Sequence, residues 1–271
     1  MTLPILARIG YTEIILFYCI GGAVVMYGTF FILRKFWPNL IVGDVDSDFI
    51  AGLHAAIFTI TFLTLGYCLV NASDTVDEYE QNVVAEANDI KSLDILLSLY
   101  GEKGSEQLRV DLRDYADSIV ETEWPMLAKR MGSEETLNYQ RKFRSDLTHL
   151  KPMSGKELII YSQILETTSK VIQARSTRIG NSDNRLAPQF MLASNIGYLC
   201  VLLISALMLT QFTWFRFLSL NIQVFAVSFI FASTISLDNP FNGADRISAD
   251  PIESIALTLN TQPQITLDPA H

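Results

Sequence analysis

Four stretches of the chain are apolar over about 20 residues, the length that an α-helix needs to cross the hydrocarbon core of a bilayer. They cover residues 14–33, 50–70, 190–209 and 217–237. The pattern predicts four transmembrane helices, arranged as one pair near each end of the chain. Four spans return the chain to its starting side, so both termini and the long segment between the pairs are expected on one side of the membrane.

The segment between the two pairs has apolar positions at spacings of three and four, the period of an amphipathic helix. Its first stripe, from Val76 to Tyr100, follows the second span without an intervening Gly or Pro. The span is therefore expected to continue beyond the lipid as one long helix, which the glycines of residues 101–104 end. Three further helices are predicted, opening near Ser105, Ser133 and Ser154, and the last one closes at Gly180.

These elements predict an all-α membrane protein with a helical extramembrane domain inserted between the second and third spans. The predicted parts are the first transmembrane pair in residues 1–70, the extramembrane domain in 71–188, the second transmembrane pair in 189–237 and a C-terminal segment in 238–271. The sequence shows neither the alternation of a β-strand nor an internal repeat.

The charge composition narrows the class of partner. The chain carries 20 basic and 29 acidic residues, a net charge of −9, which argues against nucleic acid because phosphate binding requires a basic surface. Basic residues near the span ends are more numerous on the side of the long segment, which predicts a cytoplasmic extramembrane domain. Arg8, Arg175, Arg178, Arg185 and Arg246 lie on that side, and Arg34, Lys35 and Arg216 on the other.

Residue types that carry enzymatic or metal chemistry are scattered. The three cysteines lie in apolar stretches and the three histidines are far apart in the sequence, so neither a disulfide framework nor a zinc site is expected. Glu121 and Glu123 are close carboxylates beside Trp124, but no nucleophile or Gly-rich loop accompanies them. We interpret them as a helix end packed by a tryptophan, and the chain is not expected to be an enzyme.

His54, Phe58 and Phe62 lie one turn apart on the second span. Such a row is typical of lipid contact or of helix packing. The same row would form a hydrophobic pore constriction if several copies placed this face around a common axis. Because ionisable groups inside a membrane are costly and often functional, His54 is either a proton-sensitive group in a cavity or a structural hydrogen-bonding group.

Glu86 lies among apolar neighbours on the first extramembrane helix, and Arg175 and Arg178 lie one turn apart on the last helix before the third span. An ion pair between Glu86 and these arginines is a candidate structural contact of the extramembrane domain. Such pairs contribute little to stability when they are exposed to solvent.

The fourth span ends in "LDNPFNGADRISADP", in which Asp238, Asp245 and Asp250 offer carboxylate oxygens. Pro240 stops the helix and Gly243 permits a turn. The segment is either a solvated tail or a clasp in which the three aspartates and backbone carbonyls bind a hard cation such as calcium. The order of the residues does not fit an EF-hand loop, so both interpretations stay open.

Several short motifs follow one another along the chain. They are "EAN" at residues 86–88, Tyr115 followed by "EWP" at 123–125, "RSTR" at 175–178 and "DNPFNG" at 238–243. In this order, and together with the two-plus-two layout of spans, they resemble the bacterial DUF4239 family, also called bestrophin-like proteins, over nearly the whole chain. The resemblance implies a multi-pass protein of the bacterial inner (plasma) membrane.

A more distant resemblance is to the bestrophins. Residues 239–259 look like the bestrophin Asn-Pro-Phe-Gly segment with its acidic calcium clasp and following helix, although an extra Asn242 splits the Phe-Gly pair. The second span, with Phe58 and Phe62, looks like the pore-lining neck helix. Bestrophins are pentameric, calcium-responsive anion channels, so this resemblance implies a homo-oligomer, chloride or another small anion as the conducted ion, and calcium as a ligand.

The leading hypothesis is an oligomeric membrane channel for small anions in which the second span lines the pore. The alternative is a non-conducting membrane scaffold or sensor whose helical domain binds a partner protein and whose spans only anchor it in the lipid bilayer. The number of subunits separates the two hypotheses, because a single four-span chain offers no continuous pore.

Overall fold

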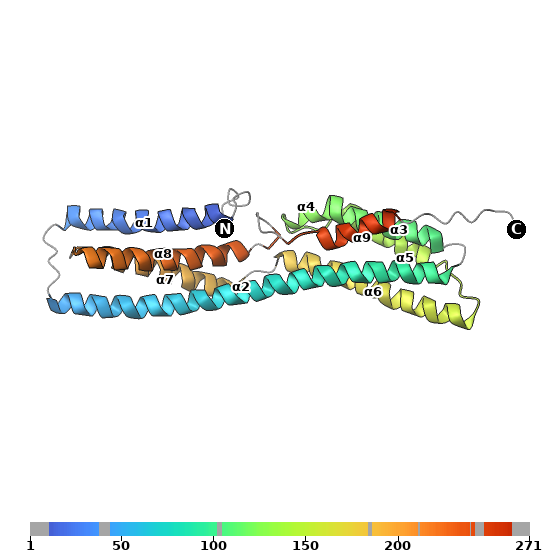
Figure 1. Ribbon diagram of the computed structural model, residues 1–271, viewed down its shortest axis with the longest axis horizontal. Helices are drawn as coiled ribbons and strands as arrows, with labels where there is room; N and C mark the ends of the chain where they lie inside the picture. The colour runs from blue at the N-terminus through green and yellow to red at the C-terminus, as the bar shows by residue number, and fades with distance from the viewer. Residues whose placement is uncertain are drawn as a thin grey trace. The chain divides into compact units, whose positions relative to one another are not determined.

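The computed structural model describes residues 11–37, 44–101, 105–183, 186–210, 212–238, 240–241 and 247–261. Every regular secondary-structure element of these residues is a helix, and turns and loops connect the helices, which confirms the all-α prediction (Figure 1). The elements are α1 (Tyr11–Phe36), α2 (Asp44–Tyr100), α3 (Ser105–Ser118), the π-helix η2 (Ile119–Glu123), α4 (Trp124–Leu127), α5 (Glu134–Leu147), α6 (Gly155–Asp183), α7 (Pro188–Met208), α8 (Trp214–Leu237) and α9 (Asp250–Thr261).

The chain divides into two compact units. Unit 1 comprises Met1–Val76 and Arg185–Arg246, and unit 2 comprises Asp77–Asn184 and Ile247–His271. Within the described residues, four helices are long and apolar enough to span a membrane, namely α1, α2, α7 and α8. The predicted C-terminal segment is therefore shared between the units, since its first part belongs to unit 1 and its remainder, including α9, to unit 2.

Helix α2 is continuous over 57 residues, as the absence of Gly and Pro after the second span predicts. It ends at Tyr100 because Gly101 adopts a left-handed backbone with φ of 69°, a conformation that glycine reaches without steric cost. The predicted end of α6 at Gly180 is wrong, because this helix continues to Asp183. A glycine weakens a helix by only about 1 kcal/mol, so it need not end one.

The core of unit 1 forms where α1, α7 and α8 meet around Tyr198. The Tyr198 hydroxyl donates to the Tyr18 carbonyl at 3.2 Å and lies 2.9 Å from Ser228 Oγ. Its ring stacks on Phe231 with 4.8 Å between ring centroids. Gly22 of α1 leaves the space that the Tyr198 hydroxyl fills. Small and hydroxyl-bearing residues thus bring three spans together, as is typical of helices in lipid.

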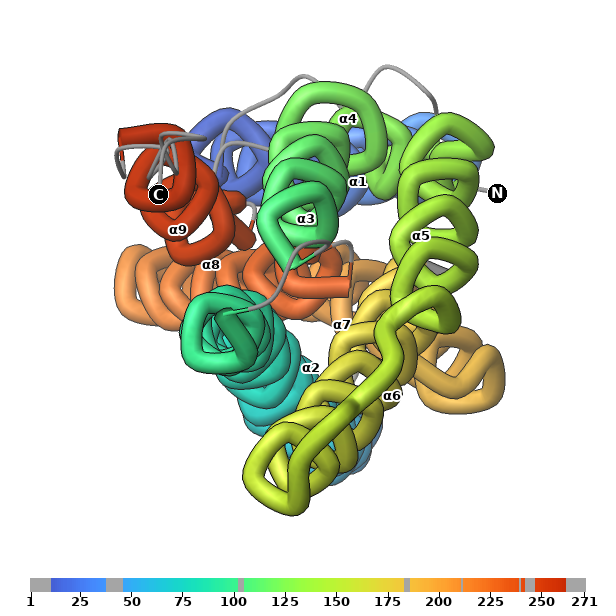
Figure 2. Tube along the Cα trace, turned by 90° about the vertical axis from the view of Figure 1, so that its right-hand side faces the viewer, coloured from blue at the N-terminus to red at the C-terminus, as the bar shows by residue number. Residues whose placement is uncertain are grey.

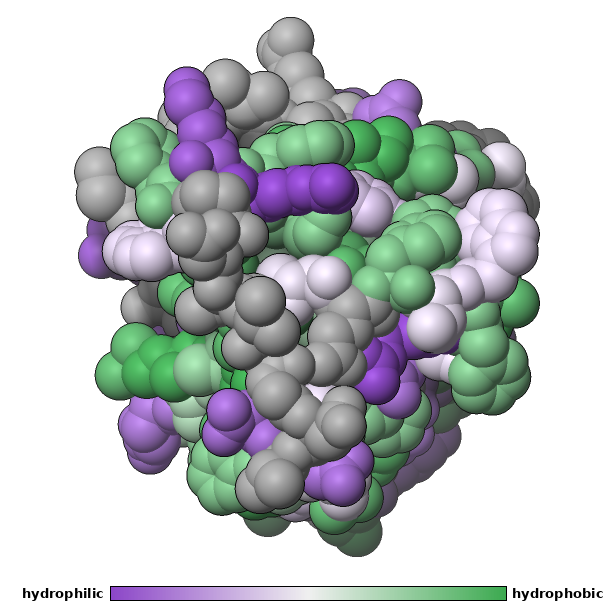
Figure 3. Space-filling model, turned by 90° about the vertical axis from the view of Figure 1, so that its left-hand side faces the viewer, coloured by the Kyte–Doolittle hydropathy of each residue, from purple (hydrophilic) through white to green (hydrophobic). Residues whose placement is uncertain are grey.

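The end of unit 1 where α1 finishes and α2 begins carries both charged and apolar side chains (Figure 3). Arg34 and Lys35 occupy the last turn of α1, and Asp46 and Asp48 are exposed in the first turns of α2. This mixture is expected where membrane spans end in water, since charges inside the hydrocarbon core are costly.

In unit 2, α3 lies between α5 and α9 (Figure 2). Ser133 caps α5, since its Oγ accepts a hydrogen bond from the Thr136 amide at 3.2 Å, and this confirms the predicted start of that helix. Apolar side chains from α2, α3 and α6 are almost fully buried in this unit, and they include Ile90, Leu93, Leu97, Leu108, Leu112 and Ile164. The amphipathic stripe of α2 therefore faces the core, as its period predicts.

The packing of α1 leads to a first prediction. Gly22→Ala should lower the thermal unfolding temperature of the purified protein in detergent, because the added Cβ would lie 2.5 Å from the Tyr198 hydroxyl and 2.8 Å from Ser228 Oγ. Overpacking of this kind costs about 1–3 kcal/mol. Gly21→Ala is the matched control, since its Cβ would meet no atom within 4 Å. Equal losses of stability in the two variants would contradict this account of the core.

Candidate functional site

The second span contacts α7 through a seam of small and polar side chains. His54 Nε2 lies 3.0 Å from Ser205 Oγ, and Cys68 Sγ lies 4.0 Å from Ser194 Oγ. Between these two contacts Thr61 faces Gly197, where an added Cβ would lie only 2.5 Å from Thr61 Oγ1. The two helices run antiparallel along this seam, and small residues let their backbones approach closely.

The row formed by His54, Phe58 and Phe62 begins inside unit 1 and turns outward. The His54 ring stacks on Phe58 at 6.2 Å between centroids, and Phe58 stacks on Phe62 at 5.7 Å. A step of four residues advances a helix by about 40° beyond one full turn, so the row winds around α2. His54 is 3% exposed and Phe62 is 37% exposed. Of the three rings, that of Phe62 is the one presented at the surface.

The outward face of α2 in unit 1 combines small residues with this phenylalanine. Ala55 and Thr59 are exposed on the same side as Phe62, and an added Cβ at Gly66 would meet no atom within 4 Å. The Thr59 hydroxyl donates to the Ala55 carbonyl at 2.8 Å. Residues 49–73 contain no Asp, Glu, Lys or Arg. This surface is therefore uncharged and partly polar, and its small residues lie among large exposed side chains such as Leu63 and Val70, which are 67% and 61% exposed.

The outward faces of α1 and α8 carry large aromatic side chains. On α1, Phe17 is 59% exposed and Phe31 is 66% exposed, and α8 exposes Phe215, Phe225 and Phe229. Large apolar side chains of this kind suit contact with lipid tails. The outward face of α2 carries large apolar side chains as well, but it also exposes Ala55 and Thr59 beside Phe62. This mixture makes it the candidate functional surface of unit 1.

A second candidate site is a cluster of four buried charges in unit 2. Arg178 of α6 donates to Glu86 of α2 from Nε at 2.8 Å and from Nη2 at 3.2 Å, and its Nη2 also lies 2.9 Å from Glu123 Oε1. Arg175 of α6 donates from Nε to both Glu123 oxygens, at 3.1 and 3.0 Å, and from Nη2 to Glu123 Oε2. All four side chains are buried.

Neighbouring groups satisfy most of the remaining hydrogen-bonding atoms of the cluster. The Ser133 amide donates to Glu123 Oε2 at 3.0 Å, and Arg175 donates to the Ser133 carbonyl at 3.1 Å. The Arg178 guanidinium lies 5.4 Å from the centre of the Trp124 ring, a cation–π contact. The Trp124 indole N–H donates to the Ile247 carbonyl at 3.3 Å. The cluster thus joins α2, η2, α6, the start of α5 and the residues before α9.

The charge of Arg178 is compensated by its two carboxylate partners. Burial alone would lower the pKa of Arg178, but Glu86 and Glu123 raise that pKa above its ordinary value. Tyr115 lies within the field of the same groups. Its burial raises the pKa of the phenol well above its ordinary range, Glu86 adds to that increase, and Arg178 opposes it. Tyr115 therefore remains a neutral hydroxyl at any physiological pH.

The sequence predicted an ion pair between Glu86 and the two arginines, Arg175 and Arg178, and it predicted no ion pair for Glu123. In the structure Arg178 contacts Glu86 and Glu123, whereas the ion pair of Arg175 is with Glu123. The reason lies in η2, where the Trp124 amide bonds the Ile119 carbonyl five residues earlier. Pro125 lacks an amide hydrogen and disfavours a regular helix in the residues before it. The position of Pro125 shortly after Glu121 and Glu123 was the feature of the sequence from which this wider turn could have been predicted.

The acidic residues proposed to bind calcium are only partly described. Asp238 is buried in unit 1, and its Oδ1 accepts a hydrogen bond from the Leu186 amide at 2.8 Å. Asp250 is exposed in the first turn of α9 in unit 2, and Asp245 lies outside the described residues. Within the part of the chain that the structure describes, no group of three His, Cys, Asp or Glu side chains is arranged to hold a metal ion. The calcium clasp stays a prediction.

Comparisons with known proteins agree with one another on the fold. A family described as the bestrophin-like domain matches residues 20–252. The crystal structure of a point variant of a membrane protein is similar with a TM-score of 0.64 and 11% identity, covering 90% of this chain and 97% of that one. A variant of a bacterial bestrophin homologue from Klebsiella pneumoniae is similar with a TM-score of 0.55 and 11% identity, covering 92% and 99%. No curated protein matches in sequence.

The shared carboxylate of the charge cluster leads to a second prediction. Glu123→Ala should destabilise the protein by about 3–5 kcal/mol, because it leaves two guanidinium groups buried without their common partner. Chemical unfolding of the purified protein measures the change. Glu121→Ala is the control, since Glu121 belongs to the same π-helix and is exposed. A Glu123 variant as stable as the Glu121 variant would show that the cluster does not hold unit 2 together.

Proposed function

This chain belongs to the bestrophin-like family, and we propose that several copies of it form a membrane channel for small anions with α2 lining the pore. The observation that carries this proposal is the outward face of α2 in unit 1. Ala55, Thr59 and Gly66 place small, uncharged residues on that face, and Phe62 is exposed among them together with larger neighbours such as Leu63. An uncharged surface that combines small residues, a threonine hydroxyl and apolar side chains is suited to a pore wall with a hydrophobic constriction.

Phe62 and Phe58 would form the constriction of this pore. A ring of apolar side chains around a common axis gates ion flow by dewetting, because an ion must lose its hydration to pass. Phe58 is half-buried and stacks behind Phe62, so it supports the exposed ring. His54 stacks behind Phe58 and is held by Ser205 of α7, so its role in the pore is to support the phenylalanines from inside the subunit.

The choice of anions rests on the similarity to bestrophins, and the chemistry of α2 is compatible with it. Cation-selective pores use rings of carboxylates, and residues 49–73 of α2 contain no Asp or Glu. The Thr59 hydroxyl and the helix backbone are the polar groups on this face. An uncharged wall of this kind places no fixed negative charge in the path of an anion.

The proposal also includes the number of subunits and the membrane in which the channel lies. The chain would form a homo-oligomeric ring in a bacterial inner membrane, with the helical extramembrane domain in the cytoplasm and five subunits, the number that the bestrophin resemblance implies. The C-terminal segment with Asp238, Asp245 and Asp250 would bind calcium and couple it to the opening of the channel.

A non-conducting scaffold or sensor is the second candidate function. It is favoured by exposed apolar residues of α6 in unit 2, where Leu158 is 58%, Ile159 63% and Leu165 45% exposed. These residues offer a surface to a partner protein. The same surface would serve a neighbouring copy of the chain in a ring, so the subunit number distinguishes the two functions.

Subunit number provides the third prediction. Native mass spectrometry of the protein in detergent or nanodiscs should give a closed ring of about five subunits, because a cyclic assembly is needed to place α2 from each copy around one axis. A monomer or a dimer would overturn the pore and favour the scaffold.

The fourth prediction concerns ion flux. Phe58→Ala combined with Phe62→Ala should increase halide flux into proteoliposomes several-fold, because the constriction would widen and stay hydrated. The matched control is Phe225→Ala combined with Phe229→Ala, since these rings also stack one turn apart, 6.4 Å between centroids, on the outward face of α8. Increased flux in the control alone, or unchanged flux in the α2 variant with the ring intact, would refute the assignment of α2 to the pore.

A further inference from the structure

His54 is the one Asp, Glu, Lys, Arg or His side chain within the four apolar stretches of the chain, residues 14–33, 50–70, 190–209 and 217–237. Histidine is the side chain that ordinarily changes its charge between about pH 5 and 8. Ionisable groups at membrane depth are costly and often functional. Because His54 stacks on the first ring of the proposed constriction, it is a candidate for regulation of the pore.

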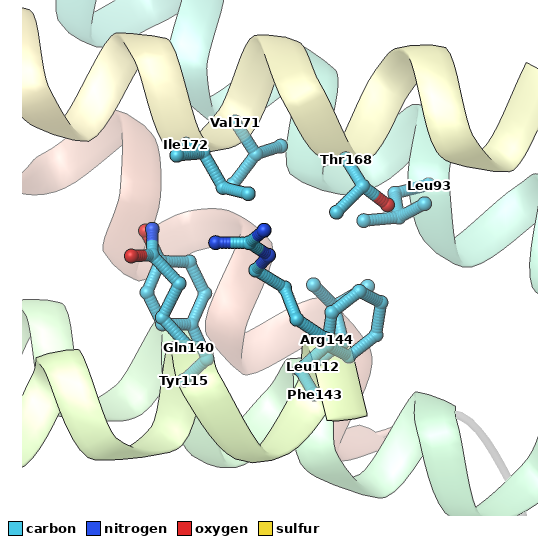
Figure 4. Close-up of a pocket in the computed structure, with 9 residues that line it drawn as sticks. All are labelled: Leu93, Leu112, Tyr115, Gln140, Phe143, Arg144, Thr168, Val171 and Ile172. Carbon is cyan, nitrogen blue, oxygen red and sulfur yellow. The ribbon is translucent and has the colours of Figure 1, made fainter. Parts of the chain in front are cut away.

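The buried groups described above in unit 2 are of a different kind. The two carboxylates and the two guanidinium groups of the charge cluster compensate one another. The cavity beside Tyr115 is walled by apolar surface from side chains such as Leu93, Leu112 and Val171 (Figure 4). Its wall therefore neither donates nor accepts hydrogen bonds, whereas the surroundings of His54 combine a hydrogen bond with an aromatic stack.

The neutral form of His54 suits the place in which the ring lies. The side chain is buried, and its Nε2 lies 3.0 Å from the Oγ of Ser205, a fully buried residue of α7. A neutral imidazole can accept a hydrogen bond from this hydroxyl or donate one to it, depending on its tautomer. The ring also stacks on Phe58. Neutral His54 therefore satisfies Ser205 and supports Phe58 at the same time.

The spans around His54 bring no carboxylate to compensate a proton on its ring. Residues 14–33, 49–73, 188–208 and 217–237 contain no Asp, Glu, Lys or Arg. Their other titratable side chains are tyrosines and cysteines, which are ordinarily uncharged at neutral pH, namely Tyr18, Cys19, Tyr27, Tyr67, Cys68, Tyr198 and Cys200. The charges at the start of α2, such as Asp48 six residues before His54, are exposed to solvent.

A proton on His54 reverses this balance. Both nitrogens of an imidazolium are donors, so the ring can no longer accept a hydrogen bond from the Ser205 hydroxyl. The charge would be attracted to the Phe58 ring by a cation–π contact. The penalty of a buried charge without a partner outweighs that attraction, because the stack supplies neither an opposite charge nor hydration. The charged ring is therefore expected to leave its place and move toward water.

We propose that protonation of His54 releases its ring from Ser205 and loosens the stack of Phe58 and Phe62, so that acidification opens the constriction. This inference rests on the proposed channel function and names a regulator of its pore. The three rings form one row, with 6.2 and 5.7 Å between neighbouring centroids, so the first ring supports the second and the second supports the third. Ser205 is a positioning residue, because it acts on the row by holding neutral His54.

Halide flux into proteoliposomes with equal pH on both sides provides the first test. The flux should be several-fold higher at about pH 5.5 than at about pH 7.5, on either side of the ordinary pKa of histidine. His54→Gln should abolish this ratio, because glutamine can hydrogen-bond to Ser205 but does not take up a proton in this range. His149→Gln is the matched control and should retain it, since His149 is exposed in unit 2. A ratio that persists in the His54 variant would overturn the proposal.

The same assay distinguishes a failure of this inference from a failure of the channel. Flux that increases when Phe58→Ala is combined with Phe62→Ala, but that does not depend on pH in the unsubstituted protein, would overturn the regulation and leave the channel intact. Absence of halide flux from both the unsubstituted protein and this double variant would overturn the channel and the regulation together.

Nitrogen NMR of the full-length protein labelled with ¹⁵N-histidine in nanodiscs tests the switch without ion flux. The chain has three histidines, and the signals that disappear in the His54→Gln variant belong to His54. These signals should change from those of a neutral to those of a charged imidazole between the two pH values. At the higher pH, Ser205→Ala should shift them, because it removes the hydrogen bond to Nε2. A His54 ring that stays neutral at the lower pH would overturn the proposal.

Discussion

The pairing of two buried carboxylates with two buried guanidinium groups is the constraint on which unit 2 depends. A buried charge is tolerated only with a partner and with hydrogen bonds to its remaining atoms, so α2, η2 and α6 are held in one register. Glu123 is central because it contacts both Arg175 and Arg178. Through Trp124 the same cluster reaches the backbone of Ile247, so the start of the C-terminal part of unit 2 is fixed by these charges as well.

Unit 1 follows a different constraint, because its helices are apolar enough to lie in lipid and gain little from burying apolar surface against one another. Its contacts are instead made by hydroxyls, glycines and aromatic rings, such as Tyr198 against Gly22 and His54 against Ser205. These contacts occupy one side of α2 and leave the other side exposed. The proposed pore face is therefore a consequence of how α2 packs on α7.

One feature of unit 1 is compatible with the passage of small anions. The outward face of α2 lacks carboxylates over the length of a membrane span, so it places no fixed negative charge along the proposed path.

The amino-acid sequence by itself determined the helices and their order, since these depend on local properties. Apolar length identifies the spans, the missing Gly and Pro make α2 continuous, and Ser133 caps α5. Sequence also singled out Glu86, Arg175 and Arg178 as charged residues in an amphipathic domain. The end of α6 was misjudged, because one glycine weakens a helix without ending it.

Only the tertiary structure decided which faces meet. In the tertiary structure Glu123 forms ion pairs with both Arg175 and Arg178, because the π-helix before Pro125 places the Glu123 side chain in the core. It put His54 inside unit 1 and Phe62 on its surface, because a row of fourth residues winds around a helix. It left the buried Tyr115 hydroxyl and the buried Gln140 amide nitrogen without a hydrogen-bond partner. Each outcome depends on contacts between residues far apart in the chain, which local pattern does not encode.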